Sequence, residues 1–202
     1  MLSVLRRTPI ALTCAAALVA ACSKADNTGD SARAADSTAV AATSTAATTP
    51  AAPAMTDANI VAYLDAANVA DSSHGSIAAA KGTNADVKSF GRDMMRDHHA
   101  LRVAGQDLAK KANITPQPMS SDTTAQHASK MADSLNAQAR GAAWDKAYID
   151  HEVMMHQAVL NTAQTALGAT QNAELRALIE KAAPNIQGHL DRAKSIQSKL
   201  QQ

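Results

Sequence analysis

The chain has 202 residues, with 19 Lys and Arg against 18 Asp and Glu, so its formal net charge at pH 7 is only +1. This balance argues against a nucleic-acid partner, because phosphate binding needs a surplus of basic residues on one face. The two cysteines, Cys14 and Cys22, both lie near the N-terminus. The rest of the chain therefore has no thiol for a disulfide, for catalysis or for binding a metal.

Residues 1–21 have the pattern of a bacterial lipoprotein signal peptide. Two arginines precede an apolar run of about a dozen residues, whereas a membrane-spanning helix needs roughly 20. The run ends in VAAC, which resembles a lipobox, so we expect Cys22 to become the lipid-modified first residue. Two alternatives stay open: paired arginines are also a feature of twin-arginine export, and a cysteine can occur by chance near a cleavage site.

The same N-terminal pattern predicts where the protein is found. A lipidated Cys22 would anchor the chain to a membrane of the cell envelope, facing the periplasm. Ser23 rather than Asp after it favours the outer membrane of a Gram-negative cell. Residues 22–55 form an Ala-, Thr- and Ser-rich segment that buries too little apolar surface to fold. We therefore expect a flexible linker there, followed by one domain at residues 56–202.

Four segments of this domain have apolar residues at every third or fourth position, as expected for helices with one buried stripe. The first begins at the capping residue Thr56, and the second begins near Asn84 and stops before NITPQP, where two prolines exclude a helix. The other two segments lie on either side of Gly168, and Pro184 should interrupt and bend the last one. The stripes include Leu64, Leu101, Leu160 and Leu178.

These segments predict an all-α fold, an antiparallel four-helix bundle. The short connections before the second and the last helix require antiparallel hairpins. Residues 121–136 have a weaker helical pattern, which we expect to be an extra short helix in the central crossover between the hairpins. No segment has the alternating pattern of a strand.

Each of the four stripes carries an ionisable residue near its middle. Asp71 and His74 lie in the first stripe, followed by His98, His156 and His189. Counted from the nearer hairpin turn at roughly 1.5 Å per residue, Asp71, His98 and His156 are expected within about 5 Å of one another along the bundle. The same count places His189 one or two turns away from them.

Buried acids and imidazoles need partners, because desolvating an isolated one costs several kcal/mol. Asp71 and His74 can pair at i, i+3, and Glu152 and His156 can pair at i, i+4, with both pairs facing one centre. Carboxylate and imidazole together are suitable ligands for iron, manganese or zinc, and the interiors of helical bundles hold such sites. The candidate metal ligands are therefore Asp71, His74, His98, Glu152, His156 and His189.

Two other interpretations stay open for these residues. The imidazoles can be purely structural, each hydrogen-bonded to a neighbouring Asp, to Tyr63 or to Tyr148. Thioether sulfurs beside them would suit copper(I) instead, although methionine at helical spacing is usually core. The methionines concerned are Met94, Met95, Met154 and Met155. The remaining histidines lie off or beside the stripes, and we expect surface positions for His99, His127 and His151.

Three segments, VKSFGRDMMRDHHAL, AWDKAYIDHEVMMHQAVL and APNIQGHLDRA, resemble those of the bacterial domain of unknown function 4142. The resemblance covers nearly all of residues 57–200 and implies an exported or lipid-anchored protein with a ferritin-like helical bundle. Matched residue by residue, it implies that the family's polar positions fall on Asp71, Asp97, His98, Asp145, Tyr148, His156 and His189.

The chain departs from the ferritin pattern in two helices. A Glu-x-x-His pair is missing there, because Met95 lies three residues before His98 and Ile186 three before His189. This departure argues against a standard two-iron oxidase centre. Asp71 also stands where the family usually has Glu, and His74 where it usually has an aliphatic residue.

The sequence favours a binding or stress-related envelope protein over a turnover enzyme. It contains no nucleophile with its base, no phosphate-binding glycine loop and no nicotinamide fingerprint. The alternative is a metal-dependent redox or metal-binding protein that uses the six candidate ligands with iron, manganese, zinc or copper.

Overall fold

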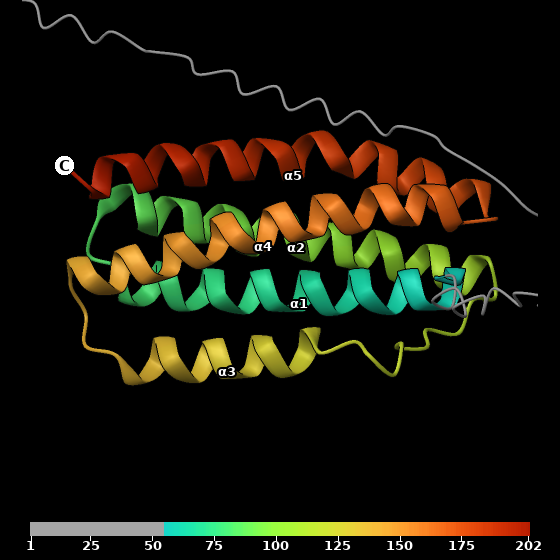
Figure 1. Cartoon of the computed structure of the whole chain (residues 1–202), viewed down its shortest axis with the longest axis horizontal. Helices are drawn as coiled ribbons and strands as arrows, with labels where there is room; N and C mark the ends of the chain where they lie inside the picture. The colour runs from blue at the N-terminus through green and yellow to red at the C-terminus, as the bar shows by residue number, and fades with distance from the viewer. Residues whose placement is uncertain (1–54) are drawn as a thin grey trace, which may run out of the picture. The chain divides into compact units, whose positions relative to one another are not determined.

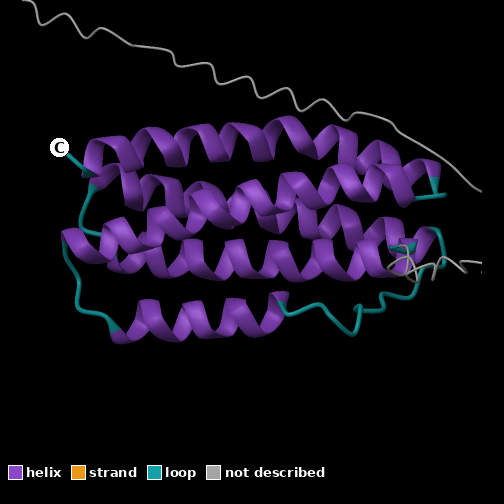
Figure 2. Ribbon diagram, viewed as in Figure 1, coloured by secondary structure: helices purple, strands orange, loops and turns teal. Residues whose placement is uncertain are grey.

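A computed structural model of the chain describes residues 55–202. The signal peptide expected at residues 1–21, Cys22 and all but the last residue of the linker lie outside this range. Within it, five helices and no strand are found, which confirms the all-α prediction (Figure 2). The helices are α1 Asp57–Lys81, α2 Ala85–Lys111, α3 Thr124–Ala137, α4 Ala142–Ala169 and α5 Ala173–Leu200.

Helix starts are fixed by capping side chains at three of the five helices. The Thr56 side chain accepts a hydrogen bond from the Asn59 backbone N–H, and the Asn59 side chain accepts one from the Thr56 N–H, which forms a capping box before α1. Asn84 and Asn172 cap α2 and α5 in the same way through their side-chain oxygens. The interruption expected at Pro184 is wrong, since α5 continues through it.

The helices run side by side along their length (Figure 1). α1 and α2 form one antiparallel hairpin and α4 and α5 form another, and the two hairpin turns lie at opposite ends of the helices. Contacts join α1 to α2, α2 to α5, α5 to α4 and α4 to α1, which closes a ring of four helices. α3 lies on the connection between the hairpins and packs against α1.

Two glycines bring α1 and α2 unusually close beside the polar centre. A Cβ on Gly75 would lie 2.6 Å from the Gly91 carbonyl oxygen, and a Cβ on Gly91 would lie 2.6 Å from the Gly75 carbonyl oxygen. Any larger residue would push the two helices apart, so this crossing depends on glycine. The crossing holds Asp71 on α1 near the His98 segment of α2.

Apolar side chains form distinct cores toward the two ends of the helices. We call the half that contains the α1–α2 turn the aromatic half; its buried core is Ala78, Val87, Phe90, Met94, Leu135, Trp144, Tyr148, Ile149, Ala193 and Ile196. We call the other half the alanine half; its buried cores are Ile60, Val61, Ala109, Ala166, Leu175 and Ile179, with Ala67, Val159 and Ile186 toward the middle. None of the described helices is long and apolar enough to cross a membrane.

Candidate functional site

Five buried polar side chains from four helices meet between the two halves. Asp71 comes from α1, His98 from α2, Glu152 and His156 from α4, and His189 from α5, and each is at most 7% exposed. Two sets have ligand atoms that all lie within 4.8 Å of one another. One set is His98, His156 and His189, and the other is Asp71, Glu152 and His156, so His156 belongs to both.

The three imidazole rings lie against one another. The ring centroids are 5.5 Å apart for His98 and His156, 5.3 Å for His98 and His189, and 5.5 Å for His156 and His189. A displacement of His189 by two turns, roughly 11 Å, is therefore wrong, because its ring is in contact with the other two. The hairpin turns lie at opposite ends of the helices, so offsets counted from the nearer turn do not share an origin.

Each ring is oriented by an acceptor on one of its nitrogens. His98 Nδ1 is 2.9 Å from Asn68 Oδ1, with Asp71 Oδ2 at 3.4 Å. His156 Nδ1 is 2.9 Å from the backbone carbonyl oxygen of Glu152, and His189 Nε2 is 3.0 Å from Asp97 Oδ2. A carbonyl, a carboxylate or the amide oxygen can only accept, so these ring nitrogens carry the proton.

The second nitrogen of each ring is left for another ligand. His98 Nε2, His156 Nε2 and His189 Nδ1 are buried and have no hydrogen-bond partner among residues 55–202. Since the opposite nitrogen carries the proton, each of these atoms presents a lone pair. A carboxylate, amide or carbonyl that fixes the far side of a metal-binding imidazole is the usual outer partner of such ligands.

Burial keeps the three imidazoles neutral at neutral pH. It lowers the pKa of His98 to about 3, helped by the neighbouring rings of His156 and His189, and lowers the pKa of His156 to about 4. Burial also lowers the pKa of His189, against the opposing effect of its hydrogen bond to Asp97. Neutral imidazole is the form that binds a metal ion, so no proton needs to be displaced from these rings.

The two carboxyl groups have the opposite response to burial. Desolvation raises the pKa of Asp71 to about 7. Burial, followed by repulsion from Asp71, raises the pKa of Glu152 well above its usual value. Asp71 Oδ1 and both Glu152 carboxyl oxygens are buried without a hydrogen-bond partner in the part of the chain that the structure describes. A cation beside them would favour the ionised forms and supply the missing partner.

The structure accounts for the family's other polar positions in different ways. Asp97 holds His189 and also accepts hydrogen bonds from Arg96. Asp145 lies in the first turn of α4 and accepts hydrogen bonds from the backbone N–H groups of Thr83 and Asn84, at 2.9 and 2.8 Å, and from the Thr83 hydroxyl. It therefore ties α4 to the α1–α2 turn and has a structural role.

Tyr148 is enclosed by the aromatic half. Its ring stacks on Trp144 with the centroids 5.8 Å apart, and it meets Phe90 edge-on. Its hydroxyl is buried without a hydrogen-bond partner among residues 55–202. Burial, and then the charge of Glu152, raises the pKa of Tyr148 well above its usual value. Tyr148 therefore stays a neutral phenol beside the acid pair.

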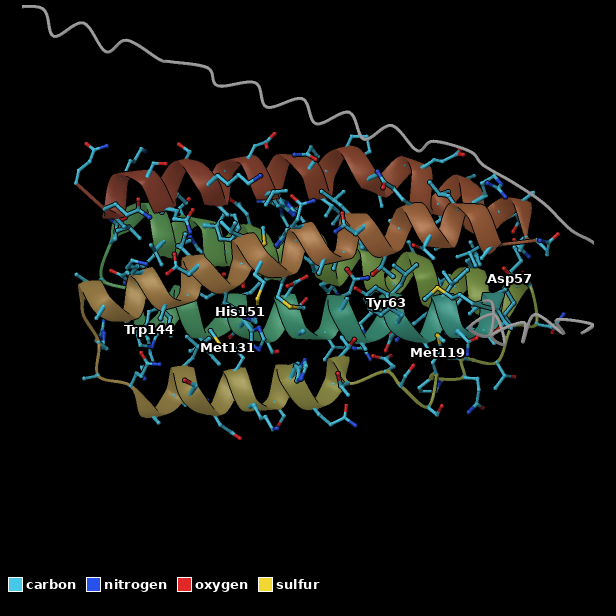
Figure 3. All side chains as sticks on the ribbon, viewed as in Figure 1. Asp57, Tyr63, Met119, Met131, Trp144 and His151 are labelled. Atoms are coloured by element: carbon cyan, nitrogen blue, oxygen red, sulfur yellow. The ribbon has the colours of Figure 1, made fainter. Side chains whose placement is uncertain are left out.

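His74 lies apart from both ligand sets. Its Nε2 is 3.0 Å from the carbonyl oxygen of Ala128 on α3, so it links α1 to α3. Its ring packs edge-on against His151 with the centroids 5.1 Å apart, and Figure 3 shows His151 on α4 near the middle of the helices. The surface position expected for His151 is wrong, since this residue is half-buried and its ring packs against His74, which is tied to α3. His99 and His127 are exposed, as predicted.

The methionines are dispersed over different environments. Met94 is completely buried in the core of the aromatic half, whereas Met95 and Met154 are 39% and 60% exposed. Sequence reasoning also missed Asn68, which orients His98. The signal was present, since Asn68 lies three residues before Asp71 and therefore on the same face of α1.

Comparison with known proteins places the chain in a family. The sequence model of the family described as "Domain of unknown function (DUF4142)" matches residues 41–196. The chain belongs to this family, as the three motif segments indicate. No curated protein and no solved structure matches the chain.

Proposed function

We propose that this member of the DUF4142 family is a metal-binding protein whose centre is the His98, His156 and His189 set. One observation carries the proposal: three neutral imidazoles from three helices each keep one buried nitrogen without a partner among the described residues. Three imidazole nitrogens form the protein part of a common site for divalent first-row transition metals. The neighbouring carboxyls of Asp71 and Glu152 either supply the fourth ligand of this ion, through an oxygen atom, or hold a second ion.

The donor set narrows the choice of metal. Imidazole with carboxylate suits zinc, iron and manganese, and the described residues offer no thiolate. Copper(I) would favour thioether ligands, and Met94 has a sufficient explanation as core. When bound, such an ion acts as a Lewis acid or as a redox centre. The chain itself supplies the oriented rings, the closed aromatic wall on one side and, in Asp71, a carboxyl able to exchange a proton near neutral pH.

A metal-free structural cluster is the weaker explanation. A buried polar atom without a hydrogen bond costs about 1 to 3 kcal/mol. The site contains at least six such atoms on five side chains, within the part of the chain that is described. A structural cluster would arrange these groups to satisfy one another, as Asp145 does with its three donors. Here the bonded partners lie on the outer sides of the rings, and no hydrogen bond joins the groups left over, within the described part of the chain.

The arrangement supports an antiparallel four-helix bundle of the ferritin-like type. The closed ring of contacts joins α1, α2, α5 and α4. α2 and α4 run in the same direction, and the connection from α2 to α4, which includes α3, runs back along the helices (Figure 1). This is the long-crossover topology of that fold. The ligand pattern differs from a two-iron oxidase, because one set consists of three imidazoles and both carboxyls lie in the other set, which shares only His156 with the first.

We place this centre in the cell envelope. The signal-peptide pattern and Cys22 support a lipid-anchored protein facing the periplasm, at the outer membrane if the cell is Gram-negative. A metal-binding or stress-related role fits this location. Expression of the full chain with radiolabelled palmitate tests the anchor: the chain should be labelled and Cys22→Ser should not. Equal labelling of both would contradict the anchor without affecting the metal proposal.

Metal content tests the proposed function. The full chain, purified without chelator, should retain about one transition-metal ion per chain, and His98→Ala with His156→Ala should remove it. The matched control is His99→Ala with His127→Ala, which removes two exposed histidines and should retain the metal. Met94→Leu with Met155→Leu should also retain it unless the ion is copper. A chain that stays metal-free after exposure to zinc, iron, manganese and copper would overturn the proposal.

A further inference from the structure

The alanine half contains a partly open cavity that reaches the proposed metal centre at Asp71 and His98. It has a volume of about 820 Å³ and lies between α1, α2, α4 and α5, next to the connection from α2 to α3. Along α1 its lining runs from Val61 to Asp71, which corresponds to roughly 15 Å of helix. Cavities of this size hold small organic molecules in other proteins.

The cavity exists because small residues line it where larger ones would meet. The residues without bulk are Ala67, Gly105, Ala109, Ala163, Ala182 and Ala183. The stripe leucines around them were expected to be core, yet Leu64, Leu101, Leu160 and Leu178 are only half-buried. Their uncovered apolar surface faces a space lined mostly by apolar side chains, and covering such surface is favourable.

The cavity has a polar group at each of two places. Asp71 and His98 lie at its inner end, where Asp71 Oδ1 and His98 Nε2 are buried without hydrogen-bond partners among residues 55–202. At the side, Asp65 accepts hydrogen bonds from Arg102 and Gln106, each at 2.9 Å. The Arg102 charge is therefore already paired, while the inner end has an acceptor nitrogen and a carboxyl to satisfy.

We propose that this cavity binds a molecule with one unbranched aliphatic chain and an uncharged hydroxyl end, with the hydroxyl at Asp71 and His98. In the metal-free chain a hydroxyl can donate a hydrogen bond to His98 Nε2 or to Asp71 Oδ1, both of which are buried without a partner among residues 55–202. A carboxylate end would be repelled by the buried acids Asp71 and Glu152. The nearby Arg102 would not compensate for this repulsion, because it is already paired with Asp65. Carbon–carbon bonds of about 1.5 Å advance roughly 1.3 Å each in a zigzag chain, so the cavity suits roughly ten to twelve carbons.

Calorimetric titration of the full chain with 1-decanol tests this proposal. The chain is used after dialysis against chelator, so the result does not depend on the metal. 1-Decanol should bind, and affinity should fall about fourfold for each methylene removed, down to 1-butanol. Decanoate at pH 8 should bind at least tenfold more weakly than 1-decanol. Equal binding of 1-decanol and 1-butanol would overturn the proposal, and equal binding of decanoate would overturn the position of the hydroxyl end.

A matched pair of glycine variants locates the binding. Gly105 lines the cavity, whereas Gly168 in α4 is exposed and does not, and a Cβ on either meets no described atom within 4 Å. Gly105→Leu should reduce 1-decanol affinity at least tenfold by filling the cavity. Gly168→Leu, which gains similar helix propensity, should leave the affinity unchanged. Unchanged affinity in Gly105→Leu would overturn the assignment to this cavity, whatever the metal analysis shows.

Discussion

The aromatic half and the alanine half contain the same four helices but have opposite interiors. Phe90, Trp144 and Tyr148 fill the first without exposure, whereas the second is built around alanines and encloses about 820 Å³. The imidazoles lie at the boundary. The difference shows how a simple helical fold can close one side of a polar centre against water and leave the other side accessible through an apolar space.

The largest expected effect compares a buried isoleucine in the aromatic half with a half-buried leucine in the alanine half. Ile149→Ala in the aromatic half should lower the free energy of unfolding by about 4 kcal/mol, because it leaves a void in a closed core. Leu178→Ala in the alanine half should cost about 1 kcal/mol or less, since this side chain already borders open space. Urea denaturation measures both. Equal losses would mean that the two interiors are packed alike.

The second comparison concerns the polar contacts at the two ends. Asp145→Ala should cost about 2 to 3 kcal/mol, because it leaves three donors at the α1–α2 turn without their acceptor. Asp57 makes the corresponding contact at the other end, to Thr170 and Gln171. Asp57→Ala should cost about 1 kcal/mol, since it removes fewer and more exposed contacts. A larger loss for Asp57→Ala in thermal unfolding would reverse this order.

The groups at the boundary between the halves should act on the stability of the metal-free chain in two opposite ways as the pH changes. Below about pH 6.5 the unfolded chain takes up protons that the folded chain excludes from His98 and His156, whose pKa values are lowered from 6.5 to about 3 and about 4, so their contribution to stability is lost as the pH falls. Asp71 acts in the opposite direction. Its pKa is raised to about 7, so its contribution is present at low pH and is lost as pH rises through 7.

Metal should change the contribution of the carboxyls to this profile. A bound cation favours their ionised forms, so the loss of the Asp71 contribution as the pH rises toward 7 should disappear in the metal-loaded chain. Chemical denaturation between pH 5 and 9, with and without metal, measures both curves. A metal-free chain whose stability is constant over this range would show that the buried acids and imidazoles are not held in their uncharged forms.

The smallest expected effect comes from a substitution that fills the cavity in the alanine half. Gly105→Leu should raise the free energy of unfolding by about 1 kcal/mol, because it gains helix propensity and covers apolar surface in the cavity. Gly168→Leu should gain less than Gly105→Leu, since its side chain stays exposed. Differential scanning calorimetry without ligand compares the two. Destabilisation by Gly105→Leu would indicate that the cavity is smaller than the structure shows.

The sequence predicts the helices well because their periodicity and capping residues are local. Thr56, Asn84 and Asn172 begin helices through contacts only two or three residues away. The stripes also identify His98, His156 and His189 as inward-facing, since inward direction follows from helical spacing alone.

The rest depends on how the helices are placed against one another. The level of His189 follows from the two hairpin turns lying at opposite ends, which no local pattern specifies. The positions of His74 and His151 depend on α3 covering α1, and α3 has a weak pattern with only Leu135 fully buried. The cavity is missed for a related reason: alanine in a stripe is compatible with close packing or with a space, and only the separation of the helices decides between them.

The central claim is that one metal ion joins the three imidazoles at the boundary of the two halves. A crystal structure of the metal-loaded full chain, with anomalous diffraction recorded at the absorption edge of the bound metal, tests it most directly. We expect an anomalous peak bound by His98 Nε2, His156 Nε2 and His189 Nδ1. Ordered water at that position, with the metal elsewhere or missing, would contradict it.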